Sequence, residues 1–254
     1  EIVSSLGLDT ESVCAALLHD TVEDCPGVTT ELVAKSTSAE IASLVDGLTN
    51  LTQIPFESKE DEHIENLRKI FLAMSKDIRV IFVKLSDRLH NMRTLSAKPE
   101  VKQRITALET MQVYAPIAHR LGIQIIKQEL ENLSLLYLDK IGYNNVLSYI
   151  DRKYGESRGF LESTQVKVEE TLREHGILCD IEGRVKSVYS IYKKMYNNNK
   201  SFDEIYDFYA MRIIVDTELE CYTVLGIIHE MYNSMPGRFK DYISTPKPNM
   251  YQSL

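Results

Sequence analysis

The sequence predicts a protein with two parts, an all-α part followed by an α+β part that holds a mixed sheet. Over residues 1 to about 135, apolar residues recur at three- and four-residue spacing, which is typical of helices packed on a core. From about residue 139 onward, segments with strand character alternate with helical ones, which favours a sheet with helices on it. A chain of 254 residues is long enough for two such domains.

In the first part the helical spacing is clearest in four segments, 38–51, 58–74, 77–95 and 101–121. Residues 58–61 resemble a capping box in which Asp61 replaces the usual Glu. Pro116 and Gly122 mark the end of this part.

In the second part a long charged helix over residues 153–175 is expected to end at Gly176. Candidate strands follow at 177–182, 209–215 and 241–244, and candidate helices lie between them at 188–196 and 221–232. This alternation is the reason for expecting a mixed sheet.

The net charge of -8 is unevenly distributed. Residues 181–254 hold nine basic and nine acidic residues, so the acidic excess lies in the first 180. An acidic surface disfavours nucleic acid as a partner, because both are negatively charged. A phosphorylated small molecule remains a possible ligand where a metal ion supplies positive charge.

Nothing in the sequence predicts a membrane partner. Apolar runs such as residues 80–83 are far too short to span a bilayer, and no signal-peptide pattern opens the chain. The four cysteines are scattered without C-x-x-C spacing, which favours a reducing, cytoplasmic compartment over a disulfide framework. Both ends interrupt a pattern, so we expect a fragment of a longer polypeptide.

The first candidate site follows an apolar run at residues 15–18 and contains His19, Asp20, Glu23 and Asp24. If the helix continues through this run, His19 lies one turn from Glu23, and Asp20 lies one turn from Asp24. Three carboxylates and an imidazole behind a buried run predict a bound cation or substrate that compensates their charge.

A second polar cluster places Asp87, Asn91 and Thr94 on one helix face. A His-Asp pair followed far downstream by a single Asp is the ligand order of HD-type metallophosphohydrolases, in which one further His precedes the pair. Imidazole and carboxylates suit Mn²⁺, which lowers the pKa of a bound water. The alternative is a chance His-Asp pair on an exposed helix. Three neighbours, Arg88, His90 and Arg93, could equally contact a ligand or form ion pairs.

In the second part, Arg184, Lys186 and Lys194 would bring cations from a strand and a helix to a triphosphate. Asp207 precedes a strand and could hold Mg²⁺ between phosphates. Further candidates are Lys240, Lys247 and Tyr251, whose ring can stack on a base. The alternative is a solvated basic face with ordinary core tyrosines.

Six segments, 15–24, 84–95, 114–122, 189–194, 236–243 and 246–254, are similar to the N-terminal catalytic region of the long RelA/SpoT-type bifunctional (p)ppGpp synthetase/hydrolases. The resemblance implies an HD-type hydrolase domain with linking helices at 1–135, which removes the 3′ pyrophosphate of (p)ppGpp with Mn²⁺. It implies a nucleotidyltransferase-like synthetase domain at 136–254, C-terminally incomplete, which transfers pyrophosphate from ATP to the 3′-OH of GDP or GTP with Mg²⁺. The function implied is the alarmone metabolism of the stringent response.

The resemblance also implies residue roles. In the first domain, Mn²⁺ would be held by His19, Asp20 and Asp87, water activated by Glu23 and Asp24, and the nucleotide contacted by Asn91 and Thr94. In the second, ATP phosphates would be held by Arg184, Lys186 and Lys194, Mg²⁺ by the catalytic Asp207, acceptor phosphates by Lys240 and Lys247, and guanine by Tyr251.

The match has departures. Met250 replaces the Gly that many members carry, and the first metal-binding His is expected upstream of Glu1. A later His and Glu of the synthetase site, and C-terminal domains through which the full-length parent could meet the ribosome and tRNA, are expected beyond Leu254. The basic segment 238–241 suggests a bifunctional parent. Two alternatives stay open, a general HD-domain nucleotide phosphohydrolase and a nucleotide-sensing fragment without activity.

Overall fold

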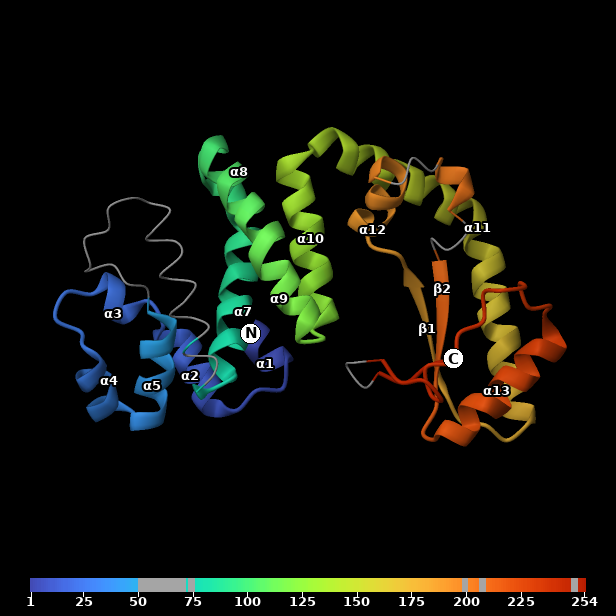
Figure 1. Cartoon of the computed structure of the whole chain (residues 1–254), viewed down its shortest axis with the longest axis horizontal. Helices are drawn as coiled ribbons and strands as arrows, with labels where there is room; N and C mark the ends of the chain where they lie inside the picture. Colours follow the sequence, from blue (N-terminus) through green and yellow to red (C-terminus); the bar gives the residue numbers. More distant parts are fainter. Residues whose placement is uncertain (50–71, 73–75, 198–200, 206–208, 248–250) are drawn as a thin grey trace. The chain divides into compact units, whose positions relative to one another are not determined.

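The protein is seen in a computed structural model that describes residues 1–49, 72, 76–197, 201–205, 209–247 and 251–254. The chain divides into two compact units, each of which is described by itself (Figure 1). The first comprises Glu1–Ala118 and Gln124–Leu130, and the second His119–Ile123 and Glu131–Leu254. The helix expected at 58–74, with its capping box, lies outside the described residues except for residue 72.

The first unit is helical, as the apolar spacing predicts. Its elements are α1 (Ile2–Ser5), α2 (Thr10–Leu18), α3 (Thr21–Asp24), α4 (Thr30–Ser36), α5 (Ala39–Leu48), α7 (Arg79–Arg93), η1 (Leu95–Ala97), α8 (Glu100–Glu109), η2 (Thr110–Tyr114), α9 (Ala115–Arg120, which runs into the second unit) and the first half of α10 (Gln124–Leu138). The helix expected at 101–121 is realised as α8, the π-helical turn η2 and α9 in direct succession.

Side-chain caps decide where several of these helices begin. The Asp9 carboxylate accepts the backbone N–H of Ser12 at 2.9 Å and starts α2, and the Ser38 hydroxyl accepts that of Ile41 at 3.1 Å and starts α5. Helices α2, α5 and α7 then pack together. Their shared core consists of buried aliphatic residues, including Ala15, Leu44, Val45, Leu48, Val80 and Val83.

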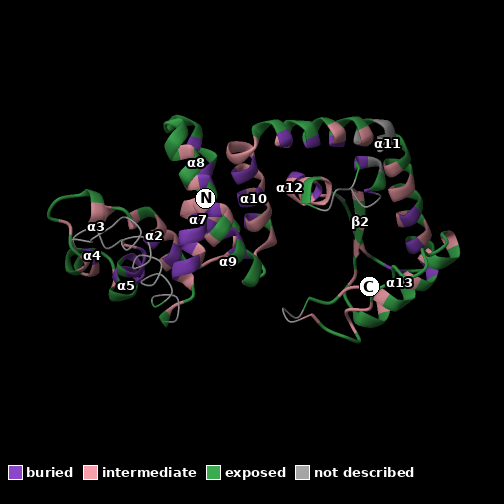
Figure 2. Cartoon of the chain, turned by 45° about the horizontal axis from the view of Figure 1, so that its top comes forward, coloured by how far each residue is buried: buried purple, intermediate pink, exposed green. Residues whose placement is uncertain are grey.

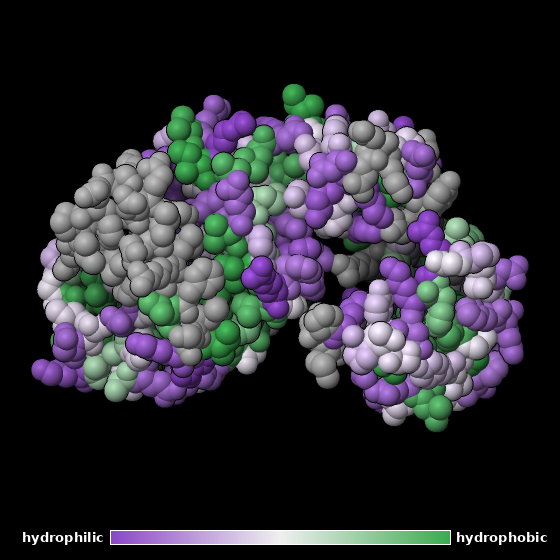
Figure 3. All heavy atoms as spheres, viewed as in Figure 1, coloured by the Kyte–Doolittle hydropathy of each residue, from purple (hydrophilic) through white to green (hydrophobic). Residues whose placement is uncertain are grey.

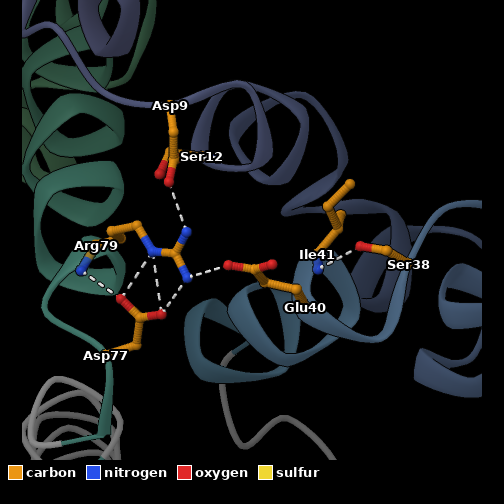
Figure 4. Close-up of polar contacts among 7 residues, drawn as sticks. All are labelled: Asp9, Ser12, Ser38, Glu40, Ile41, Asp77 and Arg79. Carbon is orange, nitrogen blue, oxygen red and sulfur yellow. Dashed lines mark hydrogen bonds and ion pairs between the residues drawn. The ribbon is translucent and has the colours of Figure 1, made fainter.

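A single guanidinium joins the beginnings of these three helices. One Nη of Arg79 lies 2.6 Å from Asp9, and the other lies 2.7 Å from Glu40 and 2.6 Å from Asp77. Figure 4 shows how the three carboxylates surround the guanidinium. Because Asp9 precedes α2, Glu40 opens α5 and Arg79 opens α7, this cluster sets the relative position of the helices that carry the candidate site.

The second unit combines long helices with a small sheet. Its elements are the second half of α10, α11 (Lys140–Glu174), β1 (Asp180–Val185), α12 (Val188–Tyr192), η3 (Lys193–Asn197), η4 (Phe202–Glu204), β2 (Tyr209–Ile214) and α13 (Glu218–Met231). Figure 2 shows buried residues recurring along one side of α11, where Val168 and Leu172 join Val224 and Ile227 of α13 in a core.

The prediction of a mixed sheet is wrong for the described residues, because they form one sheet of two antiparallel strands. Strand β1 pairs with β2 from Asp180↔Ile214 to Val185↔Tyr209. The third candidate strand, 241–244, is instead a turn, because the Asp241 carboxylate accepts the backbone N–H groups of Ile243 and Ser244 at 2.9 and 2.8 Å.

Two boundaries in this unit differ from expectation. Helix α11 begins at Lys140, well before residue 153, because the Asp139 carboxylate accepts the N–H of Gly142 at 2.9 Å and caps it. Its end is as predicted: Gly176 has φ of +75°, and its N–H bonds to the Arg173 carbonyl at 2.9 Å. The chain therefore enters β1 only at Asp180, three residues later than expected.

No helix in the described part of the chain combines the length and apolar character needed to cross a membrane. On the face seen in Figure 3, hydrophilic and hydrophobic residues are interspersed. All four cysteines, which the structure describes, are free thiols.

Candidate functional site

The first candidate site begins at a break between two helices. The helix does not continue through this run, because α2 ends at Leu18 and α3 starts at Thr21. The Thr21 hydroxyl donates to the Leu18 carbonyl at 2.6 Å, and His19 Nδ1 lies 2.8 Å from the Ala16 carbonyl oxygen. Side chains that occupy these carbonyls compete with the helical backbone bonds, so the chain turns at His19 and Asp20.

The turn brings His19 against two carboxylates. Its Nε2 lies 3.1 Å from Asp20 Oδ1 and 3.5 Å from Asp87 Oδ1, which α7 contributes. Each pair is as close as two ligands of one metal ion, whose bonds to such donors are about 2.0–2.2 Å. Across the described residues, however, no group of three or more His, Cys, Asp and Glu side chains is arranged to hold a metal ion.

The orientation of the imidazole is set by the Ala16 carbonyl. If Nδ1 donates its proton there, the neutral ring presents the lone pair of Nε2 to Asp20 and Asp87. This Nε2 is buried and has no hydrogen-bond partner among the described residues. The contact with Asp87 raises the pKa of His19, although burial opposes this shift. A lone pair facing carboxylate oxygens calls for a proton or a cation between them.

The two carboxylates experience different surroundings. Burial raises the pKa of Asp20, because its charged form loses water. Burial would do the same to Asp87, but the contact with His19 and the charge of Lys84 outweigh it and lower the pKa. Asp87 Oδ1 also accepts a hydrogen bond from Asn91 Nδ2 at 2.8 Å. Asp87 is thus a half-buried carboxylate with neighbours that fix its direction.

The remaining candidates of the first site lie around this centre. Glu23 is half-buried in α3, and Asp24 is exposed at its end. Both follow the ligand turn directly, since their backbone N–H groups bond to the Asp20 carbonyl at 3.1 and 2.8 Å. Thr94 ends α7 and donates its hydroxyl to the His90 carbonyl at 3.1 Å.

Two cations on α7 form ion pairs. Arg88 makes two hydrogen bonds to the Glu109 carboxylate, at 2.9 and 3.2 Å, and lies 4.1 Å over the Tyr114 ring. Arg93 makes two to Glu129, at 2.6 and 2.8 Å. Of the two interpretations offered for Arg88 and Arg93, ligand contact or ion pairing, the structure favours ion pairing. His90 is exposed.

The second candidate site is described only in part. Arg184 lies in β1, Lys186 in the loop before α12, and Lys194 in η3, where both lysines are half-buried. The side chain of Arg184, and Asp207 and Met250 altogether, lie outside the described residues. The structure thus places the three cations on successive elements.

The chain after α13 forms a separate aromatic and cationic cluster. Lys247 Nζ lies 4.1 Å from the centre of the Tyr242 ring and 5.1 Å from that of Tyr251. The Tyr242 N–H bonds to the Ser253 carbonyl at 2.8 Å, and the Tyr222 hydroxyl of α13 donates to Asp241 at 3.1 Å. Lys240 is exposed nearby in the sequence.

Sequence reasoning assigned no role to Lys84 or Tyr242. Lys84 is a lysine inside an apolar helical run, which is a signal that its cation has a buried partner. Tyr242 directly follows Asp241 in a candidate strand and was expected to be part of a sheet.

Comparisons with known proteins bear on both units. Residues 1–124 match the family model of the HD domain, and residues 183–254 match that of a region found in RelA / SpoT proteins. The whole chain is 46% identical to a probable guanosine-3′,5′-bis(diphosphate) 3′-pyrophosphohydrolase of Synechocystis, covering 33% of that protein. It is 45% identical to a GTP pyrophosphokinase of Myxococcus xanthus, covering 34% of it.

A third relative, a guanosine-3′,5′-bis(diphosphate) 3′-pyrophosphohydrolase of Haemophilus influenzae, is 43% identical over the whole chain, which covers 37% of that protein. The chain therefore spans about a third of the length of these relatives.

Proposed function

We propose that the chain belongs to the RelA/SpoT family and that the protein carrying it both degrades and makes (p)ppGpp. Residues 1–135 would release the 3′ pyrophosphate to leave GDP or GTP, and residues 136–254 would transfer pyrophosphate from ATP to the 3′-OH of GDP or GTP. The names of the relatives support both directions, since they include pyrophosphohydrolases and a pyrophosphokinase.

The observation that carries the hydrolase proposal is the buried Nε2 of His19, which lies 3.1 Å from Asp20 Oδ1 and 3.5 Å from Asp87 Oδ1. One neutral nitrogen and two carboxylate oxygens are a donor set that suits Mn²⁺. When bound, the ion would supply positive charge to the 3′ phosphates and lower the pKa of a water.

The residues around this centre would do the remaining work. Glu23 and Asp24 would accept the proton of the attacking water, because their helix restarts directly at the ligand turn. Asn91 and Thr94, at the end of α7, would contact the guanine nucleotide.

For synthesis, Arg184, Lys186 and Lys194 would hold the ATP phosphates, and Asp207 would hold Mg²⁺ and act in catalysis. The residues after α13 would bind the acceptor nucleotide, GDP or GTP. Lys240 and Lys247 would offset the charge of its phosphates, and Tyr251 would stack on guanine, a role supported by the exposed ring of Tyr251.

The hydrolase assignment is tested by replacing the water-activating pair. In the whole protein with Mn²⁺, we expect Glu23→Gln/Asp24→Asn to abolish release of pyrophosphate from ppGpp while circular dichroism and Mn²⁺ binding stay unchanged. Glu11→Gln makes the same change from carboxylate to amide in the first turn of α2; it is the control and should leave turnover intact. Unchanged hydrolysis in the double variant would rule out the assignment.

The same assay separates this proposal from a general HD phosphohydrolase. We expect turnover of ppGpp to exceed that of deoxynucleoside triphosphates and cyclic dinucleotides. Equal turnover of all three would favour the general enzyme, and binding of ppGpp without synthesis or hydrolysis would favour a sensing module.

A further inference from the structure

The lysine at position 84 is buried on α7 beside the proposed metal site. Only 7% of the residue is exposed, although lysine is among the residues least often buried. Removing an ammonium group from water is costly unless an anion compensates it. The position of Lys84 therefore needs a reason.

Asp87 is the ion partner that the structure gives to Lys84. The Lys84 Nζ lies 3.6 Å from Asp87 Oδ2, and the two residues are one turn apart on α7. Arg88, the neighbouring buried cation, is paired instead with Glu109 through two hydrogen bonds. Lys84 is thus the cation of α7 that pairs with Asp87.

The two oxygens of Asp87 consequently have separate neighbours. Oδ2 faces the Lys84 ammonium, whereas Oδ1 accepts the Asn91 amide at 2.8 Å and faces His19 Nε2 at 3.5 Å. Lys84, Asp87 and Asn91 form one row along α7. A carboxylate held from both sides along its helix cannot rotate freely, so one particular oxygen is presented to His19.

We propose that Lys84 is a positioning residue of the metal site, which holds Oδ2 of Asp87 so that Oδ1 is directed at the ion. The inference rests on the proposed function, because it assigns Lys84 to the same site. Lys84 touches Asp87 and is assigned no contact with substrate. Outer residues that orient a metal ligand typically change metal affinity 10- to 100-fold when they are removed.

The test is a titration of the metal-free whole protein with Mn²⁺ alone, in which electron paramagnetic resonance reports the free ion. We expect Lys84→Met to weaken binding by about 10- to 100-fold and Lys84→Arg, which retains the positive charge, to recover most of it. Lys102→Met removes the same charge from the exposed surface of α8 and should bind Mn²⁺ like the wild type. If Lys84→Met does not fold, Lys84→Gln takes its place.

If the role of Lys84 is purely structural, Lys84→Met will lower the melting temperature of the metal-free protein and leave the Mn²⁺ affinity of the folded variant unchanged. Equal or tighter Mn²⁺ binding by folded Lys84→Met or Lys84→Gln would therefore overturn the inference. Failure of the proposed function would give a different result. The wild-type protein would then either bind no Mn²⁺ or bind it with an affinity that His19→Gln does not change.

Discussion

His19, in the turn that follows α2, and Asp87 of α7 meet although they are far apart in the chain, with Nε2 of one 3.5 Å from Oδ1 of the other. The contact depends on two local features. The backbone turns at His19 because side chains take the carbonyls of Ala16 and Leu18, and Asp87 lies on the row of α7 that also carries Lys84 and Asn91. Packing of α2 on α7 then brings imidazole and carboxylate together.

Asn91 provides a first prediction, because it has an observed bond to Asp87 and a proposed contact to the nucleotide. If the bond from Nδ2 to Asp87 Oδ1 orients the ligand, Asn91→Ala weakens Mn²⁺ binding by about tenfold or more even without nucleotide. A Mn²⁺ titration of the nucleotide-free whole protein measures this. Unchanged affinity, together with a raised KM for ppGpp, would show that Asn91 acts only on the nucleotide.

The Arg88–Glu109 pair predicts a large loss of stability. Their side chains are 15% and 23% exposed, and removing one member of such a pair leaves a poorly solvated charge. We expect Arg88→Met to lower the free energy of unfolding by roughly 3 kcal/mol, measured by urea denaturation. Arg93→Met, on the same helix, removes a more exposed pair with Glu129 and should cost less than about 1 kcal/mol. Equal effects of the two variants would contradict this interpretation.

The cluster around Arg79 predicts how stability depends on pH. Hydrogen bonds from Ser12 and Arg79 lower the pKa of Asp9 from 3.8 to about 2, and Arg79 also lowers that of Asp77. Because both folded-state pKa values lie below the unfolded ones, the stabilisation is complete above about pH 4 and is lost as the pH falls toward 2.

Arg79→Met removes much of this dependence of stability on pH, because it removes the cation that lowers the pKa values of Asp9 and Asp77. Between pH 4 and pH 2, the free energy of unfolding should therefore fall less steeply in the variant than in the wild type, as denaturant melts at several pH values will measure. Parallel pH profiles would show that Arg79 does not set these pKa values.

The ring of Tyr251 gives a prediction for synthesis. Stacking of a base on an aromatic ring contributes about 1–3 kcal/mol, so Tyr251→Leu should raise the KM for GDP by roughly 5- to 150-fold, whereas Tyr251→Phe stays near the wild type. Steady-state transfer of pyrophosphate from ATP in the whole protein measures this. Tyr232→Leu, at the end of α13, is the control. Similar KM values for all variants would remove Tyr251 from the guanine site.

Helical spacing predicted most of the first unit because its helices bury one side of each against a common core, as α5 and α7 do with Leu44, Leu48, Val80 and Val83. Periodicity carries no information on side-chain hydrogen bonds. It therefore missed the break at His19, and it read 241–244 as a strand although the Asp241 carboxylate bonds to the backbone there and closes a turn.

The candidate site likewise has a part that the sequence predicted and a part that only the structure shows. Residue types and their order pointed to His19, Asp20 and Asp87 before any fold was known, since imidazole and carboxylate groups are common ligands of divalent metals. The contact of Lys247 with Tyr242 depends on where side chains meet in space, which spacing along the chain does not reveal.

The most direct test of the account is Mn²⁺-dependent release of pyrophosphate from ppGpp by the whole protein, with His19→Gln as the variant. The account predicts that chelation of the metal abolishes hydrolysis in the wild type, that added Mn²⁺ restores it, and that His19→Gln stays inactive at Mn²⁺ concentrations that saturate the wild type. Hydrolysis that persists after chelation, or that proceeds in folded His19→Gln at the wild-type rate, would contradict it.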